Sequence, residues 1–221
     1  MNWLKKHWGW ILVCILASLP LVNLLEMLSF NFEDNTYAFL LFDDYEYPPH
    51  IADQMDFDSM PGIKYASQVT GEWAIRFLLA ILMCTPLRIL FGWTCSLYTR
   101  QAIGITTGVY ALLHFLLFVT YEGVLATFSE PELIIGFLAC IIVFFLMITS
   151  NKRSMKWLKK TWKKVHRLSY FAGILALIHV ILMKEDWVLY ASILGVGFLL
   201  RYKPIRSKIE QVRVKKAKTK N

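Results

Sequence analysis

The sequence predicts an all-α integral membrane protein, built as a bundle of six transmembrane helices. Of its 221 residues, 57% are hydrophobic and 15% aromatic, and the mean hydropathy of +0.47 exceeds what the core of a soluble domain requires. The apolar residues form segments near the roughly 20 residues that a helix needs to cross a bilayer. The polar connections alternate in charge, as in membrane proteins with a fixed orientation. These three observations favour a chain whose main solvent is lipid.

Six apolar segments qualify as spans, because lipid offers no partner to an exposed backbone group and a helix satisfies its own. The first follows Lys5 and Lys6 like a signal peptide, but no small-residue cleavage site comes after it. We therefore interpret residues 1–29 as a first transmembrane anchor. The six helices are expected at about residues 8–28, 70–91, 102–121, 133–149, 165–183 and 187–200.

The charged connections predict the orientation of these helices. Residues 152–167 and the tail at 203–221 are strongly basic, whereas the connections at 30–69 and 122–132 are acidic. The positive-inside rule puts the basic segments in the cytoplasm, so six spans leave both termini there. The net charge of +8 is distributed in blocks between apolar runs. This pattern favours contact with anionic membrane lipid and excludes nucleic acid as a partner.

We interpret the chain as one domain. It consists of the anchor, an acidic outward loop at 30–69, a helical core at 70–202 and a basic cytoplasmic tail at 203–221. We identify no internal repeat and no soluble catalytic domain. The four cysteines lie far apart, in or beside apolar segments and without a CxxC pair, so we expect inert thiols buried in the membrane. They are Cys14, Cys84, Cys95 and Cys140.

Histidines inside the predicted spans are the candidate functional residues, because ionisable side chains are costly in lipid. His114 lies on the third span and His179 on the fifth, and both spans run outward from the cytoplasm. At 1.5 Å per residue, each histidine is about 18 to 21 Å from the cytoplasmic end of its helix. Two axial ligands of one heme must be level, and these two are. We predict that they ligate the iron of one b-type heme.

His166 lies thirteen residues before His179, near the cytoplasmic face. The position that would be level with it on the third span holds Arg100, followed by Gln101. A second, inner heme would therefore lack one histidine, and Arg100 or Gln101 would stand opposite His166. The heme count, one or two, stays open.

Other polar or small residues in the spans have two interpretations each. Arg76 could meet heme propionates or pair with Glu72 one helical turn earlier. Gly104 and Gly108 form a GxxxG motif that serves close helix packing or makes room for a porphyrin face. For His7 and His50 we expect no ligand role, since neither has a partner at metal-site spacing.

Several segments resemble a known family, the heme-binding membrane subunit of methionine sulfoxide reductase systems (MsrQ, or YedZ), in the ferric reductase-like transmembrane group. The resemblance covers about residues 66–207. The residues that carry it read TGEWAIRFLLAILMCTPLR, RQAIGI, YALLHFLL, ITSNKRSMKWLKKTWKKVHRLSYFAGILALIHVI and LLRYKPIRS, in this order. It implies that His114, His166 and His179 occupy heme-linked positions, and that flavin mononucleotide is a further cofactor.

The resemblance also implies a bacterial inner-membrane protein with a periplasmic 30–69 loop. Electrons would come from the quinone pool or a cytoplasmic flavin reductase, and would go to a periplasmic molybdopterin reductase that repairs methionine sulfoxide in oxidised proteins. The chain would then be an electron-transfer subunit and not the site of substrate chemistry. Three features differ from the family pattern: Thr99 before Arg100, the Glu130-Pro131-Glu132 sequence, and the length of the acidic loop.

Two other functions compete with this one. A transmembrane ferric or metal reductase would use the acidic loop to attract cations. A non-redox transporter or assembly factor would use the histidines as proton relays or hydrogen-bonding groups in a helix bundle. We expect no NADPH- or FAD-binding domain after Leu200, so an electron donor would be a separate molecule.

Overall fold

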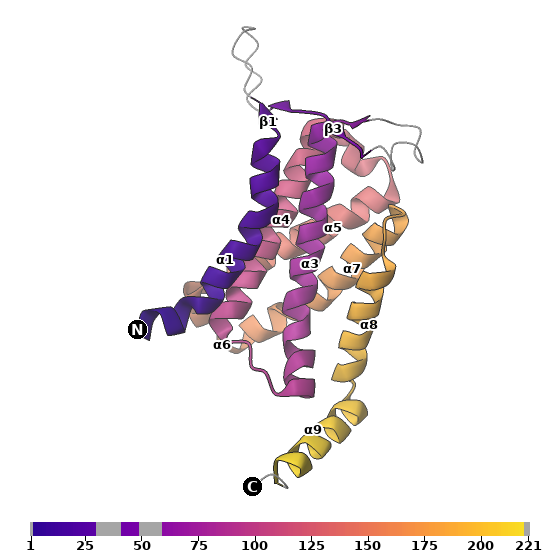
Figure 1. Ribbon diagram of the computed structural model, residues 1–221. Helices are drawn as coiled ribbons and strands as arrows, with labels where there is room; N and C mark the ends of the chain where they lie inside the picture. The colour runs from indigo at the N-terminus through magenta and orange to yellow at the C-terminus, as the bar shows by residue number, and fades with distance from the viewer. Residues whose placement is uncertain (1, 30–40, 49–58, 219–221) are drawn as a thin grey trace.

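The computed structural model describes residues 2–29, 41–48 and 59–218, and this part of the chain is predominantly helical (Figure 1). Its four strands have two residues each and form two antiparallel pairs, β1 with β2 and β3 with β4. The helices are α1 (Asn2–Glu26), α3 (Gly62–Phe91), α4 (Leu97–Glu122), η1 (Leu125–Phe128), α5 (Pro131–Thr149), α6 (Lys152–Val165), α7 (Leu168–Leu182), α8 (Val188–Arg201) and α9 (Lys203–Lys218); the strands are β1 (Leu28–Ser29), β2 (Leu41–Phe42), β3 (Tyr45–Glu46) and β4 (Ser59–Met60).

The predicted all-α membrane bundle is confirmed. Among the described residues, α3, α4, α5 and the part of α1 from Trp8 are long and apolar enough to cross a bilayer. Two bent pairs, α6 with α7 and α8 with α9, raise the number of candidate spans to six. Large apolar side chains cover the outside of the bundle; Leu116, Phe145 and Leu199 are each about half exposed. Lipid rather than water is the solvent that tolerates such a surface.

The predicted fifth span begins slightly later than expected. A helix was expected at 165–183, and α7 covers Leu168–Leu182; α6 ends just before it, at Val165, with a bend of 51° between the two helices. At 1.5 Å per residue, the 15 residues of α7 extend only about 23 Å, less than the roughly 30 Å of the hydrocarbon core. The basic α6 therefore meets the apolar α7 at an angle.

The start of α3 also differs from the prediction. The second span was expected from residue 70, yet α3 begins at Gly62, directly after Pro61. Polar residues such as Lys64 and Gln68 lower the hydropathy of this first part, although they are compatible with a helix. The two added turns extend α3 into the predicted acidic loop, most of which lies outside the described residues. They also carry Ser67, which contacts His114.

The core of the bundle forms around α3, which packs against α4, α7 and α8 (Figure 1). Ile75, Leu78, Leu79 and Leu82 of α3 and Leu194 of α8 form its buried cluster. Fully removing such side chains from solvent stabilises a fold by roughly 1.5–3 kcal/mol each in water, but in lipid the gain comes mainly from close packing. α3 is therefore the helix around which the functional residues are arranged.

Both termini lie at one end of the bundle and the strands lie at the other (Figure 1). α6 and α9, the two basic helices, are at the end with the termini. The Arg213 guanidinium of α9 donates to the carbonyl oxygen of Arg88 at 2.6 Å, near the C-terminus of α3. A cation there satisfies free carbonyl groups and the helix dipole. α3 ends at Phe91 and is capped by Gly92, whose φ of 77° is left-handed.

Candidate functional site

The two histidines expected at equal depth meet inside the bundle. His114 of α4 and His179 of α7 have ring centroids 6.4 Å apart, and their planes are at 63°. One iron held by two imidazoles through bonds of about 2 Å would separate the centroids by about 6 Å. The pair therefore fits two axial ligands of one metal centre. Within the described residues no group of three or more His, Cys, Asp or Glu side chains could hold a metal ion. A heme iron needs only two from the protein.

Hydrogen bonds leave the same nitrogen of each ring free for a metal. Nδ1 of His114 lies 2.7 Å from the carbonyl oxygen of Ser67, and Nδ1 of His179 lies 2.8 Å from that of Glu132. A carbonyl oxygen only accepts, so each Nδ1 carries the proton and donates it. Among the described residues, neither Nε2 has a hydrogen-bonding partner. A carbonyl at Nδ1 is the usual outer partner of a metal-ligating histidine, because it fixes the tautomer and the orientation of the ring.

A cavity of about 460 Å³ lies beside these two rings. Its apolar wall includes Ile75, Leu78 and Phe137, and its volume is within the range of cofactor pockets. We call it the outer cavity, because it extends toward the end of the bundle where the strands lie. Its rim carries acidic side chains and one lysine: Glu72, Glu122, Glu185, Asp186 and Lys64.

Arg76 is not among the residues that line the outer cavity. Its guanidinium donates to Glu72 at 2.5 Å and lies 5.2 Å from the centre of the Trp73 ring. Both members of the ion pair are about half exposed. Of the two roles predicted for Arg76, the structure therefore shows pairing with Glu72.

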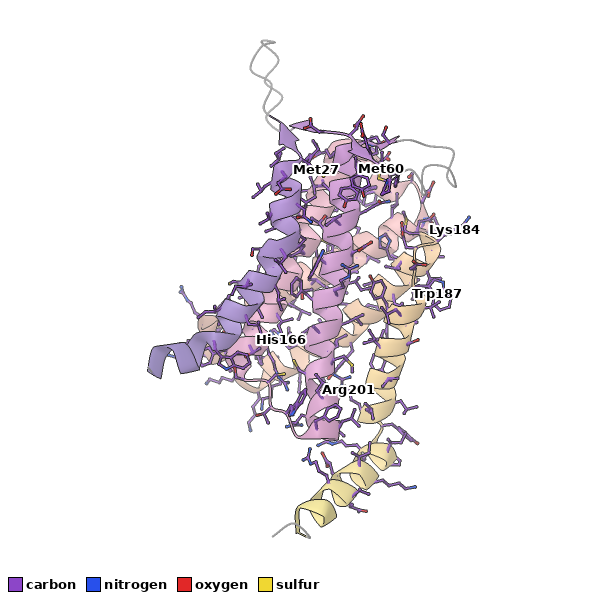
Figure 2. The ribbon with its side chains drawn as sticks, in the orientation of Figure 1. Met27, Met60, His166, Lys184, Trp187 and Arg201 are labelled. Carbon is purple, nitrogen blue, oxygen red and sulfur yellow. The ribbon has the colours of Figure 1, made fainter. Side chains whose placement is uncertain are left out.

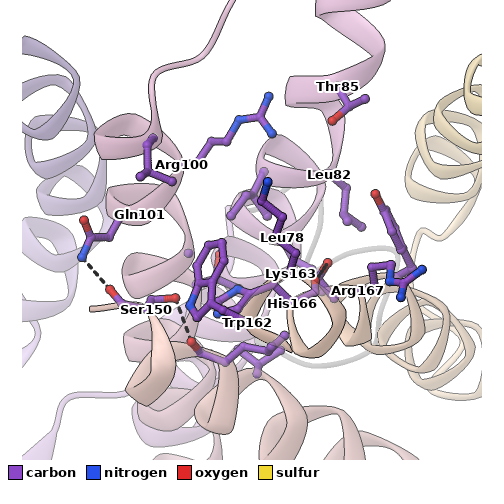
Figure 3. Close-up of a pocket in the computed structure, with 18 of the residues that line it drawn as sticks. Leu78, Leu82, Thr85, Arg100, Gln101, Ser150, Trp162, Lys163, His166 and Arg167 are labelled. Atoms are coloured by element: carbon purple, nitrogen blue, oxygen red, sulfur yellow. Dashed lines mark hydrogen bonds between the residues drawn. The ribbon is translucent and has the colours of Figure 1, made fainter. Parts of the chain in front are cut away.

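A second cavity, of about 410 Å³, lies near the opposite end of the bundle (Figure 3). We call it the inner cavity. Figure 2 shows His166 and Arg201 toward that end, away from Met27, Met60 and Lys184. The wall contains His166 together with four cationic side chains, namely Arg100, Lys163, Arg167 and Arg201.

His166 is the only histidine on the wall of the inner cavity among the described residues. The centroid of its ring lies 4.0 Å from the centroid of the Trp162 ring, and its Nε2 is 3.4 Å from the hydroxyl oxygen of Thr149. Arg100 and Gln101 line the same cavity from α4, as the level of these residues predicted. The side chain of Gln101 donates to the carbonyl oxygen of Ser150 at 2.5 Å (Figure 3).

The two cavities adjoin. Leu78 of α3, Thr107 of α4 and Val143 of α5 line both of them. Only this layer of side chains separates the two histidine-bearing sites along the bundle. The bundle thus contains two neighbouring histidine-bearing cavities.

The remaining sequence candidates have structural roles or lie outside the description. Gly108 lets α4 approach Met147 of α5, and Gly104 faces Ile81 of α3 while lining the inner cavity. The four cysteines are free: Cys84 is buried in the bundle, Cys95 and Cys140 are partly exposed, and Cys14 is exposed on the candidate span of α1, a position compatible with the predicted thiol in the membrane. The side chain of His7 and all of His50 lie outside the described residues.

The prediction that the chain has no internal repeat was wrong. His179 follows His114 by 65 residues, and the carbonyl partners Glu132 and Ser67 have the same spacing. The segments around the histidines also match, since GVYALLHFLL at 108–117 and GILALIHVIL at 173–182 share five of ten residues. Each histidine thus belongs to one of two equivalent helix pairs, α3 with α4 and α5 with α7. A comparison of the sequence with itself, shifted by 65 residues, would have detected the repeat. Without that comparison the repeat is difficult to see, because α6 is present only in the second half and the two halves are weakly similar elsewhere.

Comparisons with known proteins agree with this geometry. The model of a family described as "Ferric reductase like transmembrane component" matches residues 70–177, a range from α3 into α7 that contains His114 and His166 and ends two residues before His179. The fold and the matched range thus define a multi-pass membrane protein of the ferric reductase-like transmembrane class.

Curated relatives identify the family more closely. Proteins named "Protein-methionine-sulfoxide reductase heme-binding subunit MsrQ" are similar to this chain: the one from Xanthomonas oryzae pv. oryzae is 37% identical over 141 residues, 58% of this chain and 63% of that protein. The one from Brucella anthropi is 32% identical over 150 residues, 63% of this chain and 68% of that protein. The chain belongs to the MsrQ family. The match spans 63% of the length of the first of these relatives, and no solved structure matches the chain.

Proposed function

We propose that this chain is the b-type heme subunit of a methionine sulfoxide reductase system, with His114 and His179 as the axial ligands of one heme. The observation that carries the proposal is the pair of imidazoles, whose ring centroids are 6.4 Å apart and whose Nδ1–H groups each donate a hydrogen bond to a backbone carbonyl oxygen. Heme, when bound, supplies a one-electron couple between ferric and ferrous iron. Two protein ligands leave no open position for a substrate, which suits electron transfer.

The residues of the chain hold and insulate the cofactor. The carbonyl groups of Ser67 and Glu132 fix the rings in the tautomer that presents Nε2. The apolar wall of the outer cavity excludes water and so favours the less charged state of a bound redox centre. Lys64 is the cationic group on the rim that suits a propionate.

The electron path would cross the bacterial inner membrane from the cytoplasm to the periplasm. The basic end with α6 and α9 would be cytoplasmic, and the acidic rim periplasmic. A quinol or a cytoplasmic flavin reductase would deliver electrons near His166, where Arg100 and Gln101 also line the inner cavity. A second heme or flavin mononucleotide would bind in this cavity, whose volume of about 410 Å³ is in the range of small-molecule and cofactor pockets.

The acceptor would be a periplasmic molybdopterin reductase. Oxidising one quinol releases two electrons and two protons. Reducing one methionine sulfoxide to methionine consumes two of each and releases one water. The membrane subunit therefore has to carry two electrons per repaired residue, one at a time.

Spectroscopy of the purified protein tests the proposal. We expect a reduced-minus-oxidised spectrum of low-spin b-type heme, with at least one heme per chain. A quinol or a flavin reductase with NADH should reduce it, and a molybdopterin sulfoxide reductase should reoxidise it. A colourless, folded chain would refute the proposal and favour a non-redox role for the histidines.

A metal reductase is the second candidate, and the acidic rim of the outer cavity favours it. Four carboxylates, those of Glu72, Glu122, Glu185 and Asp186, would attract cations to the outer face. A heme-bearing preparation that reduces ferric chelates but no protein acceptor would support this function. Charge-neutralising variants of the four residues should then slow ferric reduction at low ionic strength and leave the heme spectrum unchanged.

A further inference from the structure

The duplicated geometry around the two histidines includes a glycine in each helix pair. Gly71 follows Ser67 by one helical turn on α3, and Gly136 follows Glu132 by one turn on α5. A Cβ atom at Gly71 would lie 2.9 Å from Nδ1 and Cε1 of His114. A Cβ atom at Gly136 would lie 2.8 Å from the same two atoms of His179. Each imidazole therefore lies directly against the backbone of the neighbouring helix, at a place where only glycine leaves room.

The two contacts are equivalent members of the repeat. Gly136 follows Gly71 by 65 residues, the spacing that also separates the two histidines and the two carbonyl partners. In both halves the glycine meets the edge of the ring that carries Nδ1. The glycine admits the ring, and the carbonyl one turn earlier orients it by accepting the Nδ1 proton. The free Nε2 then points away from the supporting helix.

We propose that Gly71 and Gly136 are positioning residues for the two histidines. The lack of a side chain at each sets the distance and the plane of the imidazole relative to the bound iron. The proposal rests on the proposed ligation of heme by His114 and His179. It adds that the ligand geometry is determined on the opposite helices, α3 and α5. A methyl group at either glycine would displace one ring and leave the other unchanged.

The first experiment compares G71A and G136A with a matched control. The control is G195A on α8, where an added Cβ meets no atom within 4 Å. We expect G71A and G136A to bind heme at least about tenfold more weakly than the wild type, as for other groups that orient metal ligands. The control G195A should bind heme like the wild type.

Electron paramagnetic resonance gives a readout that reports the ring planes directly. In a low-spin ferric heme with two imidazoles, the anisotropy of the g values depends on the angle between the planes, which is 63° here. Any low-spin heme left in G71A or G136A should show shifted g values, or should convert to high spin. Wild-type spectra and heme content in both variants would overturn the proposal.

A double-mutant cycle keeps the proposal testable if the alanine variants fold poorly. The three atoms nearest to an added Cβ at Gly71 all belong to His114, and those at Gly136 all belong to His179. The substitution G71A should therefore lower the thermal stability of the protein that retains His114, but not that of the H114A variant. Likewise, G136A should lower the thermal stability of the protein that retains His179, but not that of the H179A variant. Equal destabilisation in both backgrounds would overturn the proposal. The cycle works even on a colourless protein, so its failure is distinct from failure of the proposed function.

Discussion

The outer and inner cavities arise from the same duplicated helix pairs but differ in their side chains. In the outer cavity, both halves contribute an imidazole, and the rings are 6.4 Å apart. In the inner cavity, the second half contributes His166, whereas the position 65 residues earlier holds Gln101. His166 contacts the hydroxyl group of Thr149, which belongs to the same half of the repeat. Gln101 instead donates a hydrogen bond to the carbonyl oxygen of Ser150, which belongs to the other half.

The difference indicates how the duplication has diverged. The outer level keeps a symmetric donor set, which is complete for a six-coordinate heme. The inner level has one imidazole and four cationic groups, which suit an anionic or electron-delivering ligand better than a second symmetric heme. The following predictions test this contrast, from the largest expected effect to the smallest.

Removing either outer histidine should abolish the outer heme. H114A and H179A should each lower the low-spin Soret absorbance at least about tenfold, because one remaining imidazole cannot complete the coordination. The matched variant H166A changes the third histidine and should keep the outer signal. Absorbance of purified variants at equal protein concentration measures the effect. Full heme content in both H114A and H179A would show that the pair does not bind it.

Restoring the repeat should create a second symmetric site. In Q101H, an imidazole would face the inner cavity from α4 at the position equivalent to His166. We expect about one additional low-spin heme per chain, measured by pyridine hemochrome assay and paramagnetic resonance. The control Q101L removes the amide without adding a ligand and should add no heme. An unchanged spectrum in Q101H would mean that the inner level no longer has the geometry of the outer one.

Arg201 should stabilise the bundle at the inner cavity. It donates to the carbonyl oxygen of Gly197 at 2.9 Å and to that of Leu82 on α3, and it lies 5.0 Å from the centre of the Tyr170 ring. R201M should lower the free energy of unfolding by about 2 kcal/mol, because two charge-assisted hydrogen bonds are lost, one within α8 and one from α8 to α3.

Thermal or denaturant unfolding in detergent measures this change. The control R206M removes an exposed ion pair with Glu210 and should cost less than about 0.5 kcal/mol. Equal stability of R201M and the wild type would assign Arg201 to ligand binding alone.

The smallest effect concerns the acidic outer end. A hydrogen bond shared with Glu132, together with charge repulsion from it, raises the pKa of Glu130 above its usual 4.5. A raised pKa in the folded state means that stability decreases as the pH rises through that pKa. The wild type should therefore lose a small amount of thermal stability relative to E130Q as the pH rises above 4.5. Parallel pH profiles of the two proteins would contradict this expectation.

The strongest sequence predictions followed from simple geometry. Hydropathy identified the apolar segments, and the rise of a helix put His114 and His179 at one depth before any contact was known. Arg100 and Gln101 were expected near the level of His166, and all three line the inner cavity. These predictions succeeded because depth in a bilayer depends on position along a helix and little else.

Other features were outside the reach of that reasoning. The break between α6 and α7 and the early start of α3 depend on polar residues that are compatible with either a helix or a loop. The duplication was missed because α6 stands where the first half has a five-residue connection, between Phe91 and Leu97. The partial sequence similarity of the two halves becomes convincing only because the contacts between each histidine and its backbone carbonyl repeat as well.

The sequence by itself determined that the chain spans a membrane, how its charged ends are arranged, and which histidines can be level. Only the tertiary structure decided that these imidazoles meet, that each donates to a carbonyl of another helix, and that a glycine admits each ring. Backbone carbonyls are present at every residue and glycine carries no side chain, so neither has a chemical signature in the sequence. Their role arises from the packing of α4 against α3 and of α7 against α5.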